Sequence, residues 1–163
     1  MTQEQVIKLF NYKDGQLFWN VKIKNKPDVY LKAAGTLNEK HNRYQIIYNK
    51  KRYYRSRLVF LYHNGYLPEM VDHINHNSLD DRIENLRAST RSENCRNRRK
   101  AKNTTSMYLG VNFKDGSWIV RVTTPTKRLF GGTYKKETDA ALAYNKLAVK
   151  YYGEFANLNI IQP

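Results

Sequence analysis

The sequence predicts an α+β protein built from small modules. Its 163 residues are enough for one ordinary domain or for two to three small ones. Short stretches of alternating polar and apolar residues, which indicate strands, are interspersed with stretches of helical spacing. With 40% apolar and 13% aromatic residues the chain has material for small cores, so we expect it to fold.

The first third is expected to be rich in β-structure. Thr2 is a candidate cap for a short helix that runs through Phe10. Asp14-Gly15 then marks a turn, and a strand follows over residues 16–21. The chain therefore begins with a helix and a turn that leads into a strand.

A β-hairpin and a helix complete this N-terminal segment, residues 1–68. The patterns over 43–48 and 51–55 predict two strands joined by the turn Asn49-Lys50. Ser56 is a candidate cap for a helix over 57–64, which we expect to end at Gly65 because glycine commonly stops a helix.

Residues 69–100 are predicted to form a second unit with the order strand, loop, strand, helix. Residues 70–74 and 86–88 have strand character, and the polar stretch 75–84 between them indicates a loop. Thr90-Arg91-Ser92-Glu93 is a capping-box pattern, so we expect a helix from about Arg91 to about Lys100.

A linker and a C-terminal module follow. Residues 101–107 lack periodicity and are small and polar, which is typical of a linker. Residues 108–163 predict a three-stranded antiparallel sheet packed on one helix, with Thr138 as the candidate helix cap and Gly153 as its end.

Composition restricts the classes of function. Lys and Arg number 29 against 14 Asp and Glu, and the net charge of +15 favours a polyanionic partner. The single Cys excludes a disulfide framework and a zinc site built on cysteine pairs. There is no membrane-length apolar run and no signal-peptide pattern, so we expect an intracellular, cytoplasmic protein without a membrane partner.

Charge is unevenly distributed along the chain. Residues 69–93 hold six of the fourteen acids, whereas residues 40–57 hold seven basic residues and no acid. The basic stretch is interleaved with tyrosines, which suits a nucleic-acid groove, and its candidate contacts are Arg43, Arg52, Arg55 and Arg57. The alternative for each of these arginines is a solvent-exposed position on a hairpin that binds no nucleic acid. Carboxylates close to a phosphate-binding surface suggest an intervening divalent cation, the alternative being chance clustering in a solvated loop.

The polar residues of the second unit suggest a metal-dependent phosphodiesterase. A strand-loop-strand-helix arrangement brings Asp72 and Asn94 close enough to share one ion. Their oxygens are hard ligands that suit one Mg²⁺ or Mn²⁺. His73 is expected on the other face of its strand, where imidazole can take a proton from water as that water attacks phosphorus.

These residues and their spacing resemble the HNH nuclease signature, and the string VDHINHNSLDDRIENLRASTRSENCRNR is similar to that of phage-type HNH homing endonucleases. The resemblance implies a ββα-metal fold for the nuclease core, with Asp72 and Asn94 as metal ligands and His73 as general base. It also implies that Asn85 pins the loop and orients His73. Arg91 is a candidate to hold a neighbouring phosphate. A phage-encoded protein acting in a bacterial host is the corresponding expectation.

The C-terminal module resembles the APETALA-type DNA-binding domain of plant regulators, through Tyr108-Leu109-Gly110-Val111, the stretch 128–134 and Thr138-Asp139-Ala140-Ala141. The resemblance implies that the sheet enters the DNA major groove while the helix packs behind it. Alternation agrees, because Trp118, Val120 and Val122 would face the helix. The candidate DNA contacts in this module are Asn112, Lys114, Arg121, Thr123 and Arg128, the alternative for each being a solvated basic face; Arg98 in the preceding unit is a further candidate.

The function expected from the sequence is therefore a metal-dependent DNA endonuclease of the HNH type, acting on double-stranded DNA. An alternative is a sequence-specific DNA-binding regulator whose nuclease unit is an inactive scaffold. An RNA-binding function is the weaker hypothesis, because A-form RNA offers no major groove that side chains can read. One unit holds one metal and one phosphate, so a monomer would nick one strand, and a double-strand break would need a homodimer or two events.

Overall fold

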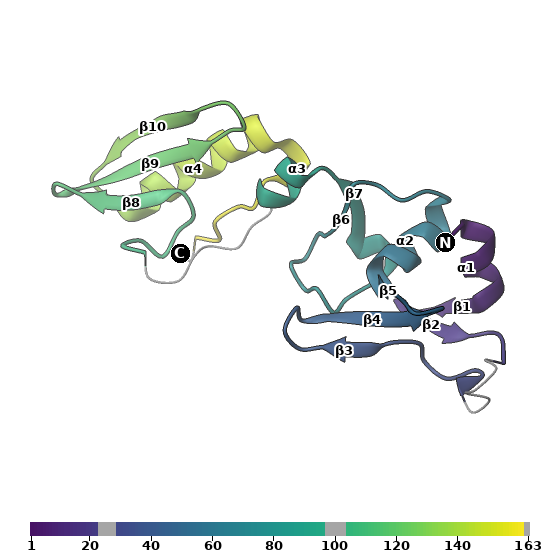
Figure 1. Ribbon diagram of the computed structural model, residues 1–163. Coiled ribbons are helices and arrows are strands. Elements are labelled where there is room, and N and C mark those ends of the chain that lie inside the picture. Colours follow the sequence, from purple (N-terminus) through teal and green to yellow (C-terminus); the bar gives the residue numbers. More distant parts are fainter. Residues whose placement is uncertain (23–28, 97–103, 162–163) are drawn as a thin grey trace. The chain divides into compact units, whose positions relative to one another are not determined.

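In the computed structural model the chain divides into two compact units, Met1–Thr90 and Arg91–Pro163 (Figure 1). The structure describes residues 1–22, 29–96 and 104–161. The units mix helices and strands, which confirms the predicted α+β class. Within the described residues, no helix combines the length and the apolar character that crossing a bilayer requires.

The N-terminal unit surrounds a central helix with small antiparallel sheets. Its pairings are β1 with β2, β3 with β4 with β5, and β6 with β7. The elements are α1 (Gln3–Leu9), β1 (Phe10–Lys13), β2 (Gln16–Trp19), β3 (Thr36–Asn38), β4 (Arg43–Tyr48), β5 (Lys51–Tyr54), α2 (Arg55–Asn64), β6 (Met70–His73), the 3₁₀ helix η2 (Ile83–Asn85) and β7 (Leu86–Ser89).

Local chemistry explains the first elements. Thr2 caps α1, and Gln5 completes a capping box with it. The turn between β4 and β5 places both Asn49 and Lys50 at positive φ, 47° and 62°, as a two-residue hairpin turn requires. The predicted hairpin is therefore confirmed, including its turn.

Helix α2 lies at the centre of this unit. Leu58 and Val59 are fully buried and pack in one core with Phe10 and Leu17. Gly65 ends the helix at φ 78°, as predicted. The prediction that Ser56 caps the helix was wrong. Helix α2 begins at Arg55, after a Tyr54 cap without a side-chain hydrogen bond, and Ser56 is buried within its first turn.

The C-terminal unit is a three-stranded antiparallel sheet packed on a helix. Strand order is β10-β9-β8, and α4 contacts all three strands. The elements are α3 (Arg91–Arg96), β8 (Val111–Lys114), β9 (Ser117–Thr123), β10 (Arg128–Tyr134), α4 (Glu137–Tyr152) and the 3₁₀ helix η3 (Gly153–Phe155).

The alternation predicted for the middle strand is confirmed. Val120 and Val122 are buried against α4, and Trp118 packs on the same core. Gly153 ends α4 as predicted, whereas the predicted cap at Thr138 was wrong. Helix α4 begins at Glu137 with Lys136 as its cap residue, two residues earlier than the predicted cap.

The segment predicted as a linker is partly packed. Residues 101–103 lie outside the described residues, as do residues 97–100 of the helix predicted from Arg91. Ser106 is buried and donates a 2.6 Å hydrogen bond from its hydroxyl to Oε1 of Glu137, which also accepts from the backbone N–H of Met107. The end of the predicted linker is thus tied to the first turn of α4.

Candidate active site

The strand pair β6–β7 carries two adjacent buried polar residues. Asp72 and His73 are each only 5% exposed at the end of β6. Asp72 lies opposite Arg87 and His73 lies opposite Leu86 in β7. Such burial is unusual for a carboxylate and an imidazole, so each of them requires a partner.

The partner of Asp72 across the strands is Arg87. Nε of Arg87 donates to Oδ2 of Asp72 at 2.9 Å, and Nη2 forms an ion pair with the same oxygen at 2.9 Å. A cross-strand pair of opposite charges stabilises the sheet and compensates the buried carboxylate. Arg87 was not among the site residues predicted from sequence, although the strand register alone would have placed it there.

The partner of His73 is Asp81. Its Oδ1 lies 2.8 Å from Nε2 of His73, and the two side chains are 2% and 4% exposed. We expected His73 to point away from Asp72, toward a bound phosphate. In the structure its ring is buried against the carboxylate of the following loop, and its approach to a phosphate stays a prediction.

Asp81 is in turn held by Arg55. Nε of Arg55 donates to Oδ2 of Asp81 at 2.8 Å, and Nη2 donates to the backbone carbonyl of Leu79 at 3.2 Å. The guanidinium carbon lies 3.8 Å from the ring centre of Tyr44, a close cation-π contact. Arg55, predicted as a DNA contact, is 6% exposed and has a structural role in the unbound protein.

The loop between β6 and β7 is held by Asn85. Its side-chain oxygen accepts from the backbone N–H of Asn75 at 3.0 Å, and its amide donates to the carbonyl of Asp80 at 2.7 Å. Its backbone carbonyl accepts from the N–H of Ile74 at 2.9 Å. Asn85 therefore bonds both ends of the loop that contains Asp81, the placement expected of a residue that pins it.

Charged side chains also order this loop from within. Nε and Nη2 of Arg82 donate to the two carboxylate oxygens of Asp80 at 2.8 Å each, and Asn75 donates to the same carboxylate. The hydrogen bond from Arg82 is the main reason that the pKa of Asp80 lies well below its ordinary value. The same pair raises the pKa of Arg82. His76 lies in the loop at φ 60°.

Two turns of the N-terminal unit support the loop from outside. The hydroxyl of Ser78 donates to the carbonyl of Asn42 at 2.7 Å, which joins the loop to the turn between β3 and β4. Gly15 packs so closely on the loop that a Cβ there would lie 2.7 Å from the backbone nitrogen of Arg82. The position of Asp81 thus depends on elements far away in the sequence.

The remaining residues predicted for catalysis and metal binding, Arg91 and Asn94, belong to α3. Arg91 is exposed and Asn94 is half-buried. Helix α3 falls in the C-terminal unit, whereas Asp72 falls in the N-terminal unit, so the shared ion between Asp72 and Asn94 stays a prediction. The described residues contain no group of three or more His, Cys, Asp or Glu side chains that could enclose a metal by themselves.

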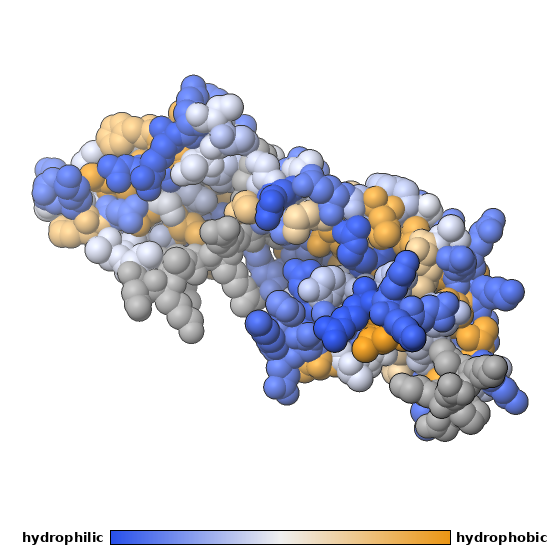
Figure 2. Space-filling model, in the orientation of Figure 1, coloured by the Kyte–Doolittle hydropathy of each residue, from blue (hydrophilic) through white to orange (hydrophobic). Residues whose placement is uncertain are grey.

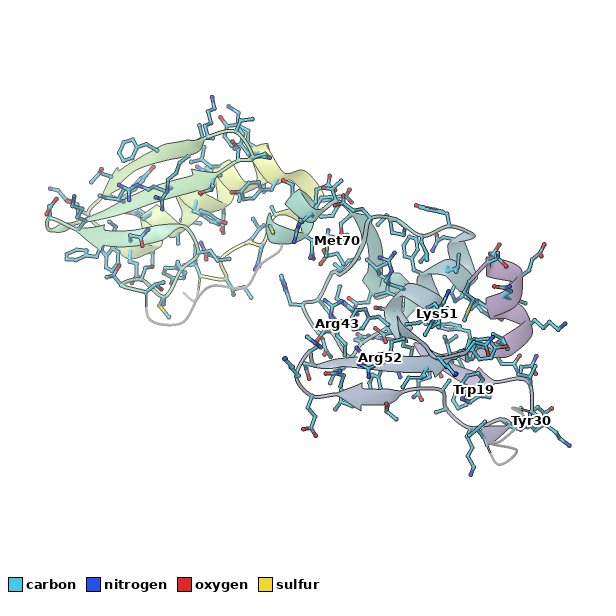
Figure 3. The ribbon with its side chains drawn as sticks, in the orientation of Figure 1. Trp19, Tyr30, Arg43, Lys51, Arg52 and Met70 are labelled. Carbon is cyan, nitrogen blue, oxygen red and sulfur yellow. The ribbon has the colours of Figure 1, made fainter. Side chains whose placement is uncertain are left out.

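The predicted basic hairpin presents two arginines on its open face. Arg43 and Arg52 lie at separate points along it (Figure 3). The register places Arg52 opposite Ile47, which is 61% exposed, whereas Lys51 points to the other face beside Tyr48. Hydrophilic residues cover much of this part of the surface (Figure 2). The guanidinium of Arg57 instead donates to the carbonyls of Glu69 and Pro68.

The predicted DNA contacts of the C-terminal sheet share one face. Pairing places Asn112 opposite Ile119, Lys114 opposite Ser117 and Thr123 opposite Arg128. Arg121 lies opposite Phe130, which is 68% exposed on the face that α4 leaves open. Phe130 was missed in the sequence analysis, although the same alternation indicates it. Arg98 lies outside the described residues.

Comparison with known proteins supports the two resemblances at a coarse level. Residues 53–96 match the family model described as HNH endonuclease. Over 78 residues, 46% of its length, the chain is 35% identical to the dehydration-responsive element-binding protein 2D of Arabidopsis thaliana. That match covers 38% of the plant protein, so the chain corresponds to well under half of its relative.

Proposed function

We propose that this protein is a metal-dependent endonuclease that hydrolyses phosphodiester bonds in duplex DNA. One observation carries the proposal: in the segment similar to HNH endonucleases, Asp72 and His73 end one strand, and Asn85 bonds both ends of the loop that follows them. A buried carboxylate next to a buried imidazole is a costly arrangement, which favours a chemical role over a purely structural one.

His73 is the proposed general base. Neutral imidazole can accept a proton from water near neutral pH, which activates that water for attack on phosphorus. Asn85 supports this role indirectly, because it fixes the loop from which Asp81 reaches His73. Arg91, exposed on α3, is the proposed contact for a neighbouring phosphate.

Asp72 and Asn94 are the residues proposed to hold the metal ion. A carboxylate and an amide oxygen suit Mg²⁺ or Mn²⁺, and so few protein ligands leave positions for water and phosphate. When bound, such an ion stabilises charge on the phosphoryl group and on the leaving 3′ oxygen. In the structure this carboxylate is paired with Arg87, so a bound ion would share Asp72 with that cation.

The two units would contribute different parts of the DNA contact. Arg43 and Arg52 on the hairpin suit phosphate contacts near the cleavage site, because they are presented on its open face. Arg121 and Asn112 on the C-terminal sheet suit base-edge contacts in the major groove. We therefore propose a sequence-directed nicking enzyme, with one strand cut by each protomer.

A DNA-binding regulator with an inactive nuclease scaffold is the second candidate. It is favoured by the similarity to a plant protein named for binding a DNA element, and by the engagement of Asp72 and His73 with Arg87 and Asp81. Both candidates predict DNA binding that weakens steeply with salt, by roughly 10³ to 10⁵-fold between 50 and 200 mM for about six to ten phosphate contacts. Salt dependence therefore does not separate them.

Nicking of supercoiled plasmid DNA separates the two candidates. We expect the protein to convert supercoiled plasmid to the open circle with MgCl₂ or MnCl₂ and not with EDTA, and we expect Asp72→Ala to remove this activity while DNA binding remains. Binding without nicking under either metal would exclude the nuclease and leave the regulator.

A further inference from the structure

We propose that Asp81 is the positioning residue of His73: its carboxylate, fixed by Arg55, accepts the Nε2 proton and leaves Nδ1 as the nitrogen that takes the proton from water. The inference has a structural part, the orientation of the ring, which is independent of activity. Its kinetic part rests on the proposed nuclease function.

The direction of the hydrogen bond follows from the charges around Asp81. Arg55 can only donate, and it cannot lose its proton in a protein, so its bond to Oδ2 favours the ionised carboxylate. An ionised carboxylate only accepts hydrogen bonds. Oδ1 at 2.8 Å from Nε2 must therefore receive a proton from His73. Since neutral imidazole carries one proton, its lone pair is then on Nδ1.

Both Arg55 and Asp81 are held by several fixed partners. Arg55 is held by the ring of Tyr44 from β4 and by the carbonyl of Leu79 as well as by Asp81. Asp81 has both carboxylate oxygens engaged and is 2% exposed. A side chain with fixed partners on both oxygens has little freedom to reorient, so it restricts His73 to one rotamer and one tautomer.

A purely structural ion pair does not need this geometry. Arg55 and Asp81 already compensate each other's charge, and Oδ1 of Asp81 could have been satisfied by a backbone N–H or water. Oδ1 of Asp81 instead bonds the imidazole of His73, the residue that follows Asp72 in β6. This bond to His73 is what distinguishes a positioning role of Asp81 from a role in a buried salt bridge alone.

The substitution Asp81→Asn makes the proposal testable because it inverts the tautomer. The asparagine oxygen must face Arg55, which can only donate, so the amide NH₂ faces Nε2 of His73. Nε2 then has to accept, and the imidazole proton moves to Nδ1. The nitrogen that serves as the base is thereby blocked, while the shape of the site is kept.

The experiment combines nicking kinetics with NMR of protein carrying nitrogen-15-labelled histidine. We expect a slowly exchanging Nε2–H signal from His73, and in Asp81→Asn the proton should be found on Nδ1. For Asp81→Asn, kcat should fall by about 10² to 10⁴-fold, while KM and DNA affinity should stay within about three-fold.

Asp14→Asn is the matched control. It removes the same charge from an exposed side chain that lines the same cavity of about 420 Å³ as Asp81 and Arg55. Asparagine tolerates the φ of 48° at this position, so nicking should be unchanged. Wild-type kcat and a retained Nε2–H signal in Asp81→Asn would overturn the proposal.

Two further outcomes keep the result interpretable. If the wild-type protein does not nick DNA with any metal, the nuclease function fails, and the position of the His73 proton in the two proteins still decides the orientation. If Asp81→Asn does not fold, Asp81→Glu replaces it, since it keeps the charge and lengthens the side chain by one methylene. Its carboxylate is displaced relative to His73, so kcat should fall at unchanged KM. A wild-type kcat for Asp81→Glu would count against positioning.

Discussion

Arg87 meets Asp72 directly across the β6–β7 pair, where its Nε donates to one carboxylate oxygen at 2.9 Å and its Nη2 pairs with the same oxygen at 2.9 Å. The proposed metal ligand is therefore already compensated by a cation in the protein without metal. Arg87 and a divalent ion would share one carboxylate, so removing the arginine should change how strongly the protein responds to metal.

We predict that Arg87→Gln destabilises the protein by about 3 kcal/mol, because it removes the cation that is paired with the buried carboxylate of Asp72. Millimolar MgCl₂ should restore part of this loss and raise the melting temperature of the variant more than that of the wild type. Arg82→Gln, which removes an arginine that is 52% exposed, is the matched control. If MgCl₂ raises the melting temperatures of wild type and Arg87→Gln equally, this would argue against a metal at Asp72.

His73→Ala should abolish nicking and leave DNA binding intact. Loss of a general base costs roughly 10² to 10⁴-fold in rate, and no DNA contact is assigned to the buried imidazole. Nicking assays and fluorescence anisotropy on the same preparations would measure the two effects. The control is His41→Ala, since His41 is exposed in the turn between β3 and β4. Parallel loss of binding and cleavage in His73→Ala would contradict the base role.

Gly15 should be far less tolerant of a side chain than Gly65, although the two have nearly equal φ values of 77° and 78°. Gly65→Ala should cost about 1 kcal/mol for its left-handed backbone, because it meets only the flexible end of Gln3. Gly15→Ala meets the backbone of Asp81 and Arg82, so it should cost roughly 1 to 3 kcal/mol more.

Denaturant unfolding of both glycine variants would test this difference, and nicking kinetics would add a second readout. Because Gly15 presses on the loop that carries Asp81, Gly15→Ala should also lower kcat. Similar stabilities for the two variants would show that the loop moves aside at little cost.

The ion pair of Asp80 and Arg82 should make the stability of the loop depend on acid pH. The pKa of Asp80 is depressed in the folded protein, chiefly by its hydrogen bond from Arg82. Its stabilising contribution is therefore present above the ordinary Asp pKa of about 3.9 and is lost as pH falls toward the folded-state value.

Asp80→Asn is the test of this pH dependence. Wild type should melt at a higher temperature than Asp80→Asn at neutral pH, and the difference should shrink steadily below pH of about 4. A difference that stays constant down to the lowest measurable pH would show that the charge of Asp80 contributes nothing.

The open face of the C-terminal sheet should carry DNA affinity. Arg121→Met removes a guanidinium from this face and should weaken binding by roughly 5 to 150-fold, the value of about 1 to 3 kcal/mol for one base contact. The control Lys146→Met removes the same charge from an exposed position on α4, the helix that packs behind the sheet. Binding would be measured on a duplex selected by the wild type from random DNA. Equal effects of the two substitutions would point to a general charge effect.

The spacing of apolar residues and the residue types at turns were sufficient to predict much of the fold. The hairpin of β4 and β5 and the burial of Val120 and Val122 follow from alternation and from a two-residue turn, which are local properties. The predictions that Ser56 and Thr138 cap helices were wrong because a helix can begin without a hydroxyl cap, as α2 and α4 do after Tyr54 and Lys136. Ser56 is buried within the first turn of α2 and does not precede the helix.

The sequence by itself determined which residues are candidates for the chemistry: Asp72, His73 and Asn85 stand at a spacing that resembles a known signature, and the basic stretches are the candidates to bind a polyanion. Only the tertiary structure decided their partners. Asp81 reaches His73, and Arg55 reaches Asp81 from 26 residues away, because α2, β6 and one loop enclose the same small volume. Charges buried in that volume have no water to satisfy them, so they pair with whichever groups the fold brings close, and no local pattern records that choice.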